Sequence, residues 1–363
     1  MRYTVEERHE RILELVRAAG TLRVTELAEQ LDISTVTLRR DVEQLAVQGR
    51  LERVRGSVSW PHAETPEGRG HLIAPAAAGA VIGLVVPQAT HYFADVIRGA
   101  QDATAAAGGR LVLAVTNYQP SQDAAQAERL VAAGVDGLLL VPSWITGEDS
   151  GSADWLELGV PAALVERRGT PGTIAAELDR VCSDHAAGAG LALRHLASLG
   201  HRQIALVSGI SATQVQVRRG YEAALSALGL SAPMPPVELY AGDVVPERIE
   251  AVADTLAAAV GERRISAALV VGDVDALLIV QSLRARGVRV PEDLALVAYD
   301  DDVAALSDLP LTAIAPPKHA VGEAAVRLLL QRLSAEGKGI PRYHLDLLPE
   351  LRLRVSCGRL LPR

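Results

Sequence analysis

Seven short apolar runs recur between residues 81 and 300, and most are separated by segments of helical spacing that end in glycine. The runs are Val81–Pro87, Arg110–Thr116, Gly137–Pro142, Pro161–Glu166, Gln203–Gly209, Ala267–Asp273 and Leu294–Asp300. Apolar strands that alternate with amphipathic helices are typical of parallel sheets covered on both faces. The spacing indicates two such units in series, changing near Val181–Asp184. Ligands in such sheets bind beyond the carboxyl ends of the strands, so the residues after each run are site candidates.

The charge of the chain is negative overall and unevenly distributed. Its 363 residues carry a formal net charge of −8, and this length corresponds to about two to three domains. Residues 1–60 contain ten Arg and ten acidic residues, whereas residues 34–60 alone contain five Arg and three acids. Such a protein does not coat nucleic acid along its whole surface, so a DNA contact must be local and must depend on a few arginines.

The cysteines and the hydropathy pattern indicate a cellular compartment. Cys182 and Cys357 are isolated and have no metal-like spacing, which suits a reducing cytosol. The first residues, MRYTVEERHE, lack the apolar segment of a signal peptide. The chain has no uninterrupted apolar stretch long enough for a membrane span, which requires about 20 residues. We therefore expect a cytoplasmic protein that does not enter a membrane.

The first 50 residues have the spacing of three short helices. Thr4 and Glu7 form a capping-box pair that predicts the start of a helix ending at Gly20. Val24–Leu31 predicts a second helix. Ser34 is a good N-cap for a third helix.

The third helix and the segment after it have a buried side and a basic side. Leu38, Val42 and Leu45 fall at i, i+4 and i+7 and predict one buried stripe, with Arg40 nearly opposite. Leu51–Trp60 alternates loosely, as a small hairpin does. The combination predicts a compact helical module with a basic outer face.

The outer face has the chemistry of DNA contacts, because Arg pairs with guanine and Ser or Thr holds phosphates. The candidates are Ser34, Thr35, Thr37, Arg39, Arg40, Gln44, Arg53 and Arg55. The pattern S-x-x-T-x-R-R-D-V from Ser34 to Val42 resembles the DNA-binding domain of the DeoR family. The resemblance implies a winged helix-turn-helix whose third helix reads double-stranded DNA. From the residues alone, a helical dimerisation module is the alternative, and Asp41 either pairs with an arginine or is solvated.

Residues 80–363 resemble the sensor domain of the LacI/GalR family, which has the fold of periplasmic sugar-binding proteins. The resemblance rests on phrases in the family's order, among them VIGLVVPQATHYFADVIRGAQDATAAAG, VDGLLLVPS, LGHRQIALVSG and RVPEDLALVAYDD. It implies an α/β fold: an N-terminal winged helix-turn-helix plus a two-lobed, periplasmic-binding-protein-like sensor with parallel sheets. We expect a DNA-binding domain at 1–60, a linker at 61–78 and a sensor at 79–363. The expected lobes are 79–181 with 312–337, and 182–311 with 338–363.

The resemblance implies a small polar ligand held between the lobes. The ligand candidates follow predicted strands or open helices: Tyr92, Phe93, Trp144, Glu166, Arg167, Asp184, Gln214, Asp273 and Asp300. Three alternatives stay open: Phe93 belongs to the core, Trp144 lies on a surface loop, and Asp273 caps a helix or stabilises the hinge.

One ligand motif departs from the family. The family commonly has a ligand-gripping Arg in an R-x-x-G-[FY] motif, and Val217 stands at its place here. Gln214 and Gln216 are the nearby side chains that can replace it as hydrogen-bond donors.

No arrangement typical of catalysis is evident. The G-x-G at Gly188–Leu193 fits tight helix packing better than a nucleotide site. The acids at Asp300–Asp302 lack supporting His or Cys and fit a solvated turn better than a metal site. We therefore expect no enzyme activity, no cofactor and no metal.

The sequence as a whole predicts a ligand-responsive transcriptional regulator, with repression as the family default. We expect a homodimer on pseudo-palindromic operator DNA and a sugar or related small molecule as effector. Two alternatives are a transport-type sugar-binding protein and a sugar-processing α/β protein with a regulatory head.

Overall fold

The computed structural model describes most of the chain and divides it into two units, 1–72 and 73–363. The described residues are 8–9, 11–13, 15–16, 21–31, 33–47, 52–54, 57–59, 79–144, 156–209, 211–239, 246–334 and 339–358. The predicted linker at 61–78 lies outside them. No helix among the described residues is long and apolar enough to cross a bilayer.

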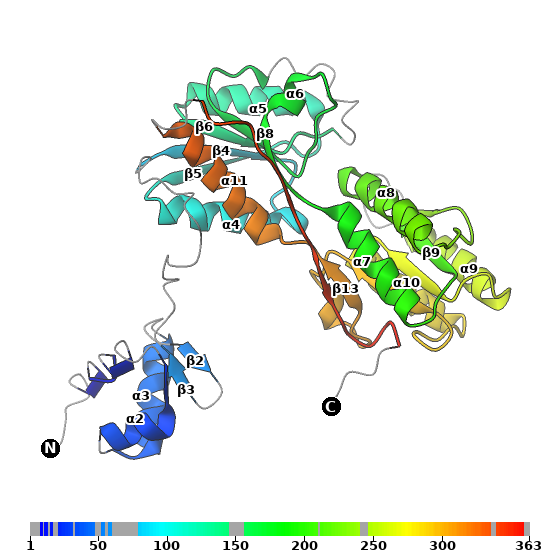
Figure 1. The fold of residues 1–363 in the computed structure, drawn as a ribbon, viewed down its shortest axis with the longest axis horizontal. Helices are drawn as coiled ribbons and strands as arrows, with labels where there is room; N and C mark the ends of the chain where they lie inside the picture. Colours follow the sequence, from blue (N-terminus) through cyan, green and yellow to red (C-terminus); the bar gives the residue numbers. More distant parts are fainter. Residues whose placement is uncertain are drawn as a thin grey trace. The chain divides into compact units, whose positions relative to one another are not determined.

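The first unit is a small α/β module (Figure 1). Its elements are β1 (Thr21–Arg23), α2 (Val24–Gln30), α3 (Thr35–Val47), β2 (Glu52–Val54) and β3 (Ser57–Ser59). The strands are antiparallel in the order β1-β3-β2, so the predicted hairpin gains a third strand that the sequence analysis missed. The predicted stripe of Leu38, Val42 and Leu45 is confirmed, because each side chain is at most 1% exposed.

The second unit contains two lobes, each built on a six-stranded sheet (Figure 1). The sheet of the first lobe has the order β14-β8-β7-β6-β4-β5, and all its pairs are parallel. Its strands are β4 (Val81–Val86), β5 (Arg110–Val115), β6 (Gly137–Leu140), β7 (Ala162–Val165), β8 (Asp179–Ser183) and β14 (His344–Leu347). Its helices are α4 (Tyr92–Ala106), α5 (Pro120–Ala132), α6 (Ile174–Glu177) and α11 (Lys318–Leu333).

The sheet of the second lobe has the order β10-β9-β11-β12-β13-β15, and only β15 is antiparallel to its neighbour. Its strands are β9 (Ile204–Ser208), β10 (Val237–Glu238), β11 (Ala267–Val270), β12 (Ala295–Tyr299), β13 (Thr312–Ala315) and β15 (Glu350–Arg352). Its helices are α7 (His185–Ser198), α8 (Ala212–Ala227), α9 (Pro246–Gly261), α10 (Asp273–Ala285) and the 3-10 turn η3 (Ala304–Leu306).

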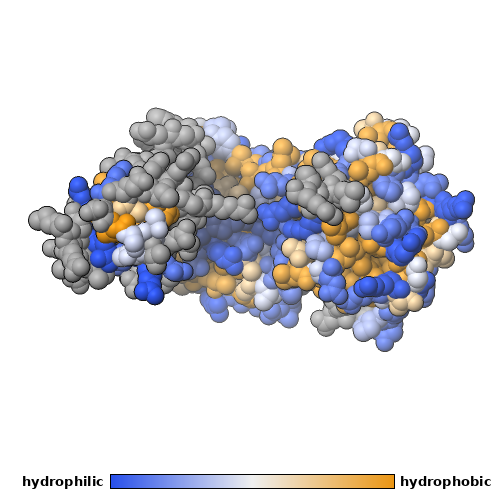
Figure 2. Space-filling model, turned by 90° about the horizontal axis from the view of Figure 1, so that it is seen from below, coloured by the Kyte–Doolittle hydropathy of each residue, from blue (hydrophilic) through white to orange (hydrophobic). Residues whose placement is uncertain are grey.

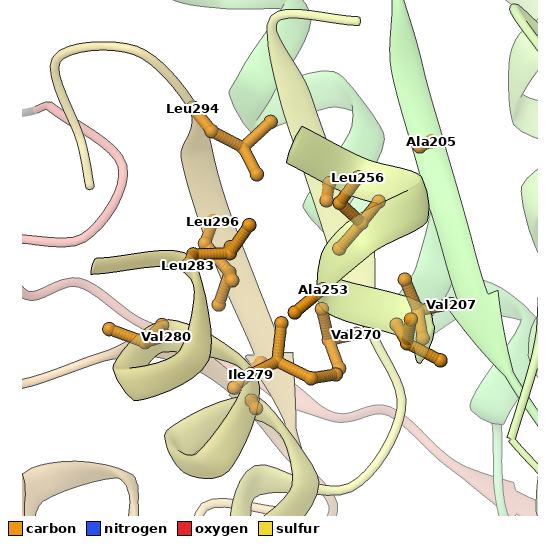
Figure 3. Packing of buried hydrophobic residues seen from close by; sticks show 14 of the residues in the cluster. Ala205, Val207, Ala253, Leu256, Val270, Ile279, Val280, Leu283, Leu294 and Leu296 are labelled. Carbon is orange, nitrogen blue, oxygen red and sulfur yellow. The ribbon is translucent and has the colours of Figure 1, made fainter. Parts of the chain in front are cut away.

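Both faces of each sheet are apolar, which explains the unbroken apolar runs in the sequence. Along β9, Ile204 and Leu206 join one buried cluster, whereas Ala205 and Val207 join the cluster on the opposite face. Figure 3 shows the second of these clusters, in which side chains of α9 and α10 pack toward β11 and β12. The predicted α/β fold with parallel sheets is confirmed.

Two of the predicted lobe boundaries are wrong. The sequence analysis assigned 312–337 to the first lobe, but β13 pairs with β12 in the second. It assigned 338–363 to the second lobe, but β14 pairs with β8 in the first. The chain therefore crosses between the lobes after β8, β13 and β14. Hydrogen bonding across strands decides this assignment, and hydropathy along the chain does not record it.

In the first lobe, α4 and α11 pack at a distance that only glycine allows. A Cβ on Gly99 would lie 2.0 Å from the carbonyl oxygen of His319, and a Cβ on Gly322 would lie 2.0 Å from that of Val96. The backbone of the opposite helix therefore packs directly against each glycine. The closeness of the two helices depends on both positions.

We expect Gly99→Ala to lower the free energy of unfolding of the sensor by about 2 kcal/mol, because overpacking displaces a neighbouring backbone. The measurement is urea unfolding of the full chain. The matched control is Gly261→Ala in α9, where nothing lies within 4 Å of the added Cβ. Equal stability of the Gly99 and Gly261 variants would contradict the close packing.

Candidate functional sites

The third helix of the first unit begins as the sequence predicts. The Ser34 hydroxyl accepts a hydrogen bond from the Thr37 backbone N–H at 3.1 Å and lies 2.8 Å from the Thr37 hydroxyl. Thr35 and Arg40 are exposed, on a helix whose opposite stripe is buried. The side chains of Arg39, Gln44 and Arg53, and all of Arg55, lie outside the described residues. Of the predicted DNA-contacting side chains, the described ones lie together at the start and on the outer side of α3.

Asp41 binds a residue that the sequence analysis did not single out. Its carboxylate accepts hydrogen bonds from Arg8 Nε at 2.5 Å and Arg8 Nη2 at 3.1 Å, and His9 Nε2 lies 3.3 Å away. Burial opposes ionisation, but the bonds and charges of Arg8 and His9 hold the pKa of Asp41 below its usual value. This acid therefore ties the first helical segment to α3.

In the sensor, Glu166 lies at the centre of the polar side chains at the strand ends. It follows β7 with a φ of 54°, and its side chain is 3% exposed. Its carboxylate accepts bonds from the Tyr92 hydroxyl at 2.7 Å, the Ser183 hydroxyl at 2.8 Å and the Ser183 N–H at 3.1 Å. The His185 Nε2 lies 3.4 Å away. Burial raises the pKa of Glu166, but these donors outweigh it and lower the pKa to about 2.

His185 joins this carboxylate to the second lobe. Its Nδ1 lies 3.1 Å from the Tyr299 hydroxyl, at the end of β12. Gly188 makes room for that hydroxyl, because a Cβ there would lie 2.4 Å from it. Ser183, His185 and Tyr299 were not among the predicted site residues. Their only sequence signal was their position beside the predicted lobe change and beside Asp300.

Asp300 carries the unsatisfied acceptor of the second lobe. Its Oδ1 is buried and has no hydrogen-bond partner within the described part of the chain. Burial, together with Asp273 and Asp302, raises the pKa of Asp300 to about 6, although Lys318 and His185 oppose the rise. The Lys318 ammonium binds the Asp300 carbonyl oxygen at 2.8 Å and the Asp302 carboxylate, and it lies 5.0 Å from the Tyr92 ring centroid. Lys318 was not predicted.

Two of the predicted acids have structural partners. Asp273 accepts bonds from the backbone N–H groups of Val303 at 2.5 Å and Ala304 at 3.0 Å, which holds the loop after β12. Asp184 caps α7 by accepting from the Ala187 N–H at 2.9 Å. The Asp273 contacts hold the loop before η3 within the second lobe; they neither cap α10 nor lie at a crossing between the lobes, the two alternatives considered for this acid.

The two predicted aromatic residues Phe93 and Trp144 pack into the first lobe. Phe93 is 4% exposed in the core against α11, as its alternative interpretation expected. Trp144 is 9% exposed and packs in the cluster on the opposite face of the sheet, so it is not a surface residue. Tyr92 is the aromatic residue that reaches the polar groups.

Val217 stands where the family commonly has a ligand-binding arginine, and the nearby side chain that can bind a ligand is the amide of Gln214. Val217 is fully buried in the core. The Gln214 Oε1 is buried and, among the described residues, has no hydrogen-bond partner. Arg167, in the first lobe, is 6% exposed and donates to the carbonyl oxygens of Pro142 at 2.7 Å and Glu166 at 2.8 Å.

Known protein families match both parts of the chain. The model of the DeoR-like helix-turn-helix domain matches residues 8–64, and that of the periplasmic binding protein-like domain matches residues 193–357. The HTH-type transcriptional repressor PurR of Haemophilus influenzae strain PittEE is 31% identical over 286 residues, which cover 77% of this chain and 82% of the relative. The arabinose metabolism transcriptional repressor of Geobacillus stearothermophilus is 26% identical, over 85% of this chain and 83% of the relative.

Solved structures agree with these relatives. The transcriptional regulator CelR in its cellobiose complex has a TM-score of 0.65 and 25% identity, and the match covers 89% of this chain and 90% of that one. A LacI family transcriptional regulator from Mycobacterium smegmatis has a TM-score of 0.61 and 29% identity, over 76% and 98% of the two chains. Both predicted resemblances are confirmed. The chain therefore belongs to the LacI family of DNA-binding transcriptional regulators, and it carries a DeoR-like helix-turn-helix domain ahead of the sensor.

Proposed function

We propose that this regulator represses metabolic genes by binding operator DNA through α3 and the β2–β3 wing, and that a small effector at the sensor strand ends changes its operator affinity. The observation that carries the DNA-binding part is the two-sided character of α3. Its apolar stripe is buried, while Thr35 and Arg40 are exposed to solvent. A recognition helix needs this division, because one side packs on its own domain while the other meets base edges.

Several contacts with DNA follow from this proposal. Arg40 pairs with a base edge in the major groove, with Arg39 and Gln44 beside it on α3. Thr35 and Thr37 hold phosphates near the start of the helix, where backbone N–H groups also favour anions. Arg53 and Arg55 of the wing follow the DNA backbone. The buried pair of Asp41 with Arg8 supports this scheme, because it turns the acid next to Arg40 toward its own domain.

The effector in this proposal is a sugar or a related polyhydroxylated molecule. A ligand hydroxyl that donates to Asp300 satisfies a buried acceptor that otherwise costs free energy. Tyr92 lies close to this position, because the Lys318 ammonium that binds the Asp300 carbonyl oxygen also lies over its ring. Support also comes from the relatives, one named for arabinose metabolism and one solved with cellobiose. We propose that no turnover of the effector occurs and that the protein acts in the cytoplasm, where its operator is.

We also propose that the protein forms a homodimer. Leu306 is 81% exposed on η3, which packs beside α10, where Val274 is 38% exposed. The edge strand β5 exposes Leu113 by 39%. In Figure 2, hydrophobic side chains lie between the hydrophilic ones on the visible face of the second lobe. Contiguous exposed apolar patches mark interaction sites, and we propose that Leu306 and Val274 belong to the surface through which two copies pair. Pairing of two copies presents two recognition helices to half-sites about 34 Å apart, or a multiple of that distance.

We expect Arg40→Ala to weaken operator binding about ten- to a hundredfold, because a bidentate contact to a base is lost. Fluorescence anisotropy on a genomic fragment selected by the wild-type chain measures this loss. The control is Arg218→Ala in the second lobe, which removes a partly exposed ion pair with Glu238 at 3.0 Å. Unchanged operator affinity in the Arg40 variant would count against α3 as the recognition helix.

We expect the ionised Asp300 side chain to lower the free energy of unfolding of the sensor at neutral pH. The pKa of Asp300 is about 6 in the folded chain, against a usual 3.8. The folded state therefore holds this proton more tightly than the unfolded state, and stability falls as the pH rises from about 4 to about 6. We expect Asp300→Asn to raise the free energy of unfolding by up to about 2 kcal/mol near pH 8, and to change little near pH 4.

Urea unfolding of both proteins across this pH range measures the difference. Asp293→Asn is the control of opposite sign, because hydrogen bonds from Arg289 lower the pKa of Asp293 to about 2. Its contribution is stabilising above about pH 4 and is lost as the pH falls toward 2. An Asp300 variant that is less stable than the wild type near pH 8 would show that the carboxylate is satisfied in the free protein.

A further inference from the structure

Arg167 is a buried cation without an anionic partner. It follows Glu166 at the end of β7, and only 6% of it is exposed. Its Nε and Nη1 donate to two backbone carbonyl oxygens, of Pro142 and Glu166. Its Nη2 donates to no described residue, and no carboxylate of the described chain forms an ion pair with it. Buried charges in proteins are normally paired, so this guanidinium calls for a partner from outside the chain.

The carboxylates nearest to Arg167 are occupied by other donors. Glu166 accepts from Tyr92 and Ser183 and faces His185. Asp123 accepts from the Ser143 N–H at 2.7 Å and the Ser143 hydroxyl at 2.8 Å. The sequence neighbour Arg168 differs, because it forms an ion pair with Asp346 at 2.5 Å. Of these two adjacent arginines, only Arg167 lacks an ion pair with a described carboxylate.

The position of Arg167 is that of a ligand-binding residue. It lies at the carboxyl edge of the first-lobe sheet, where it donates to Pro142, two residues after the neighbouring strand β6. Ligands of open parallel sheets bind beyond this edge. Burial lowers the pKa of Arg167, while the charges of Tyr118, Glu166 and Asp123 oppose the change, so the group remains a cation.

The second lobe presents the opposite chemistry. Its unsatisfied buried atoms among the described residues are two acceptors, Asp300 Oδ1 and Gln214 Oε1. The arginine that commonly grips the ligand from this lobe is replaced by the buried Val217. A ligand that satisfies both lobes therefore offers donors to the second lobe and acceptors to Arg167.

We propose that Arg167 binds an acidic group of the effector, a carboxylate or a phosphate, and that the effector is therefore an acidic sugar derivative whose hydroxyls donate to Asp300. The inference rests on the proposed effector site. The planar guanidinium suits this role, because its three remaining N–H donors, one on Nη1 and two on Nη2, can meet the paired oxygens of an anion. Arg167 thus acts as a specificity-determining residue that separates acidic from neutral sugars.

The test uses the full chain and matched neutral and acidic ligands. Calorimetry and thermal shift compare glucose with gluconate and glucose 6-phosphate, and galactose with galactonate and galactose 6-phosphate. Inorganic phosphate and acetate, at ionic strength matched with KCl, serve as probes of the anion site alone. The variants are Arg167→Gln and Arg167→Lys, with Arg168→Gln as the matched control, because it removes an adjacent cation that already has a carboxylate partner.

We expect the wild-type chain to be stabilised by phosphate or acetate beyond KCl, and to bind an acidic sugar at least tenfold more tightly than its neutral counterpart. Arg167→Gln should lose both effects, Arg167→Lys should retain part of them, and Arg168→Gln should retain both. The carboxylate and phosphate arms identify which acid is preferred. The proposal is overturned if neutral sugars bind as tightly as acidic ones, or if no anion distinguishes the wild type from Arg167→Gln.

Failure of the proposed function has a different signature. In that case acidic sugars bind through Arg167 but operator affinity is the same with and without them. Measuring operator binding on the same samples separates the two outcomes.

Discussion

The buried carboxylate of Glu166 is the interaction on which the arrangement of the sensor depends. It collects the hydroxyls of Tyr92 and Ser183 and faces His185, and through His185 it reaches Tyr299 in the other lobe. An ionised group this deeply buried persists only because every contact is a donor. Its donors come from α4, from the end of β8 and from the start of α7, so a single charge links elements of both lobes.

Around this satisfied centre, the chain leaves a few polar groups unsatisfied. Asp300 Oδ1 and Gln214 Oε1 accept no bond from a described residue, and Arg167 forms no ion pair with a described carboxylate. Such groups lower the stability of the folded protein, and binding sites are where proteins retain them. The contrast with Glu166 and Asp273, whose oxygens are occupied, separates residues that hold the sensor together from those that meet a ligand.

The DNA-binding unit divides its charges in the same way. Asp41 is paired with Arg8 inside the unit, whereas its neighbour Arg40 is exposed to solvent. Asp41 therefore serves the packing of two helices, and its charge is neutralised inside the unit. The bond spans 33 positions along the chain, so it forms only when the helical module is assembled.

The sequence by itself determined the element types, the buried stripe of α3 and the parallel α/β architecture, because hydrophobic periodicity and capping are local properties. It also marked Tyr92, Glu166, Arg167 and Asp300, since the end of an apolar run marks the carboxyl edge of a sheet. Tertiary structure alone decided that β13 and β14 belong to opposite lobes from those predicted. It alone brought His185, Tyr299 and Lys318 to these strand ends. Strand pairing and buried hydrogen bonds join residues more than a hundred positions apart, and no pattern along the chain records which partners meet.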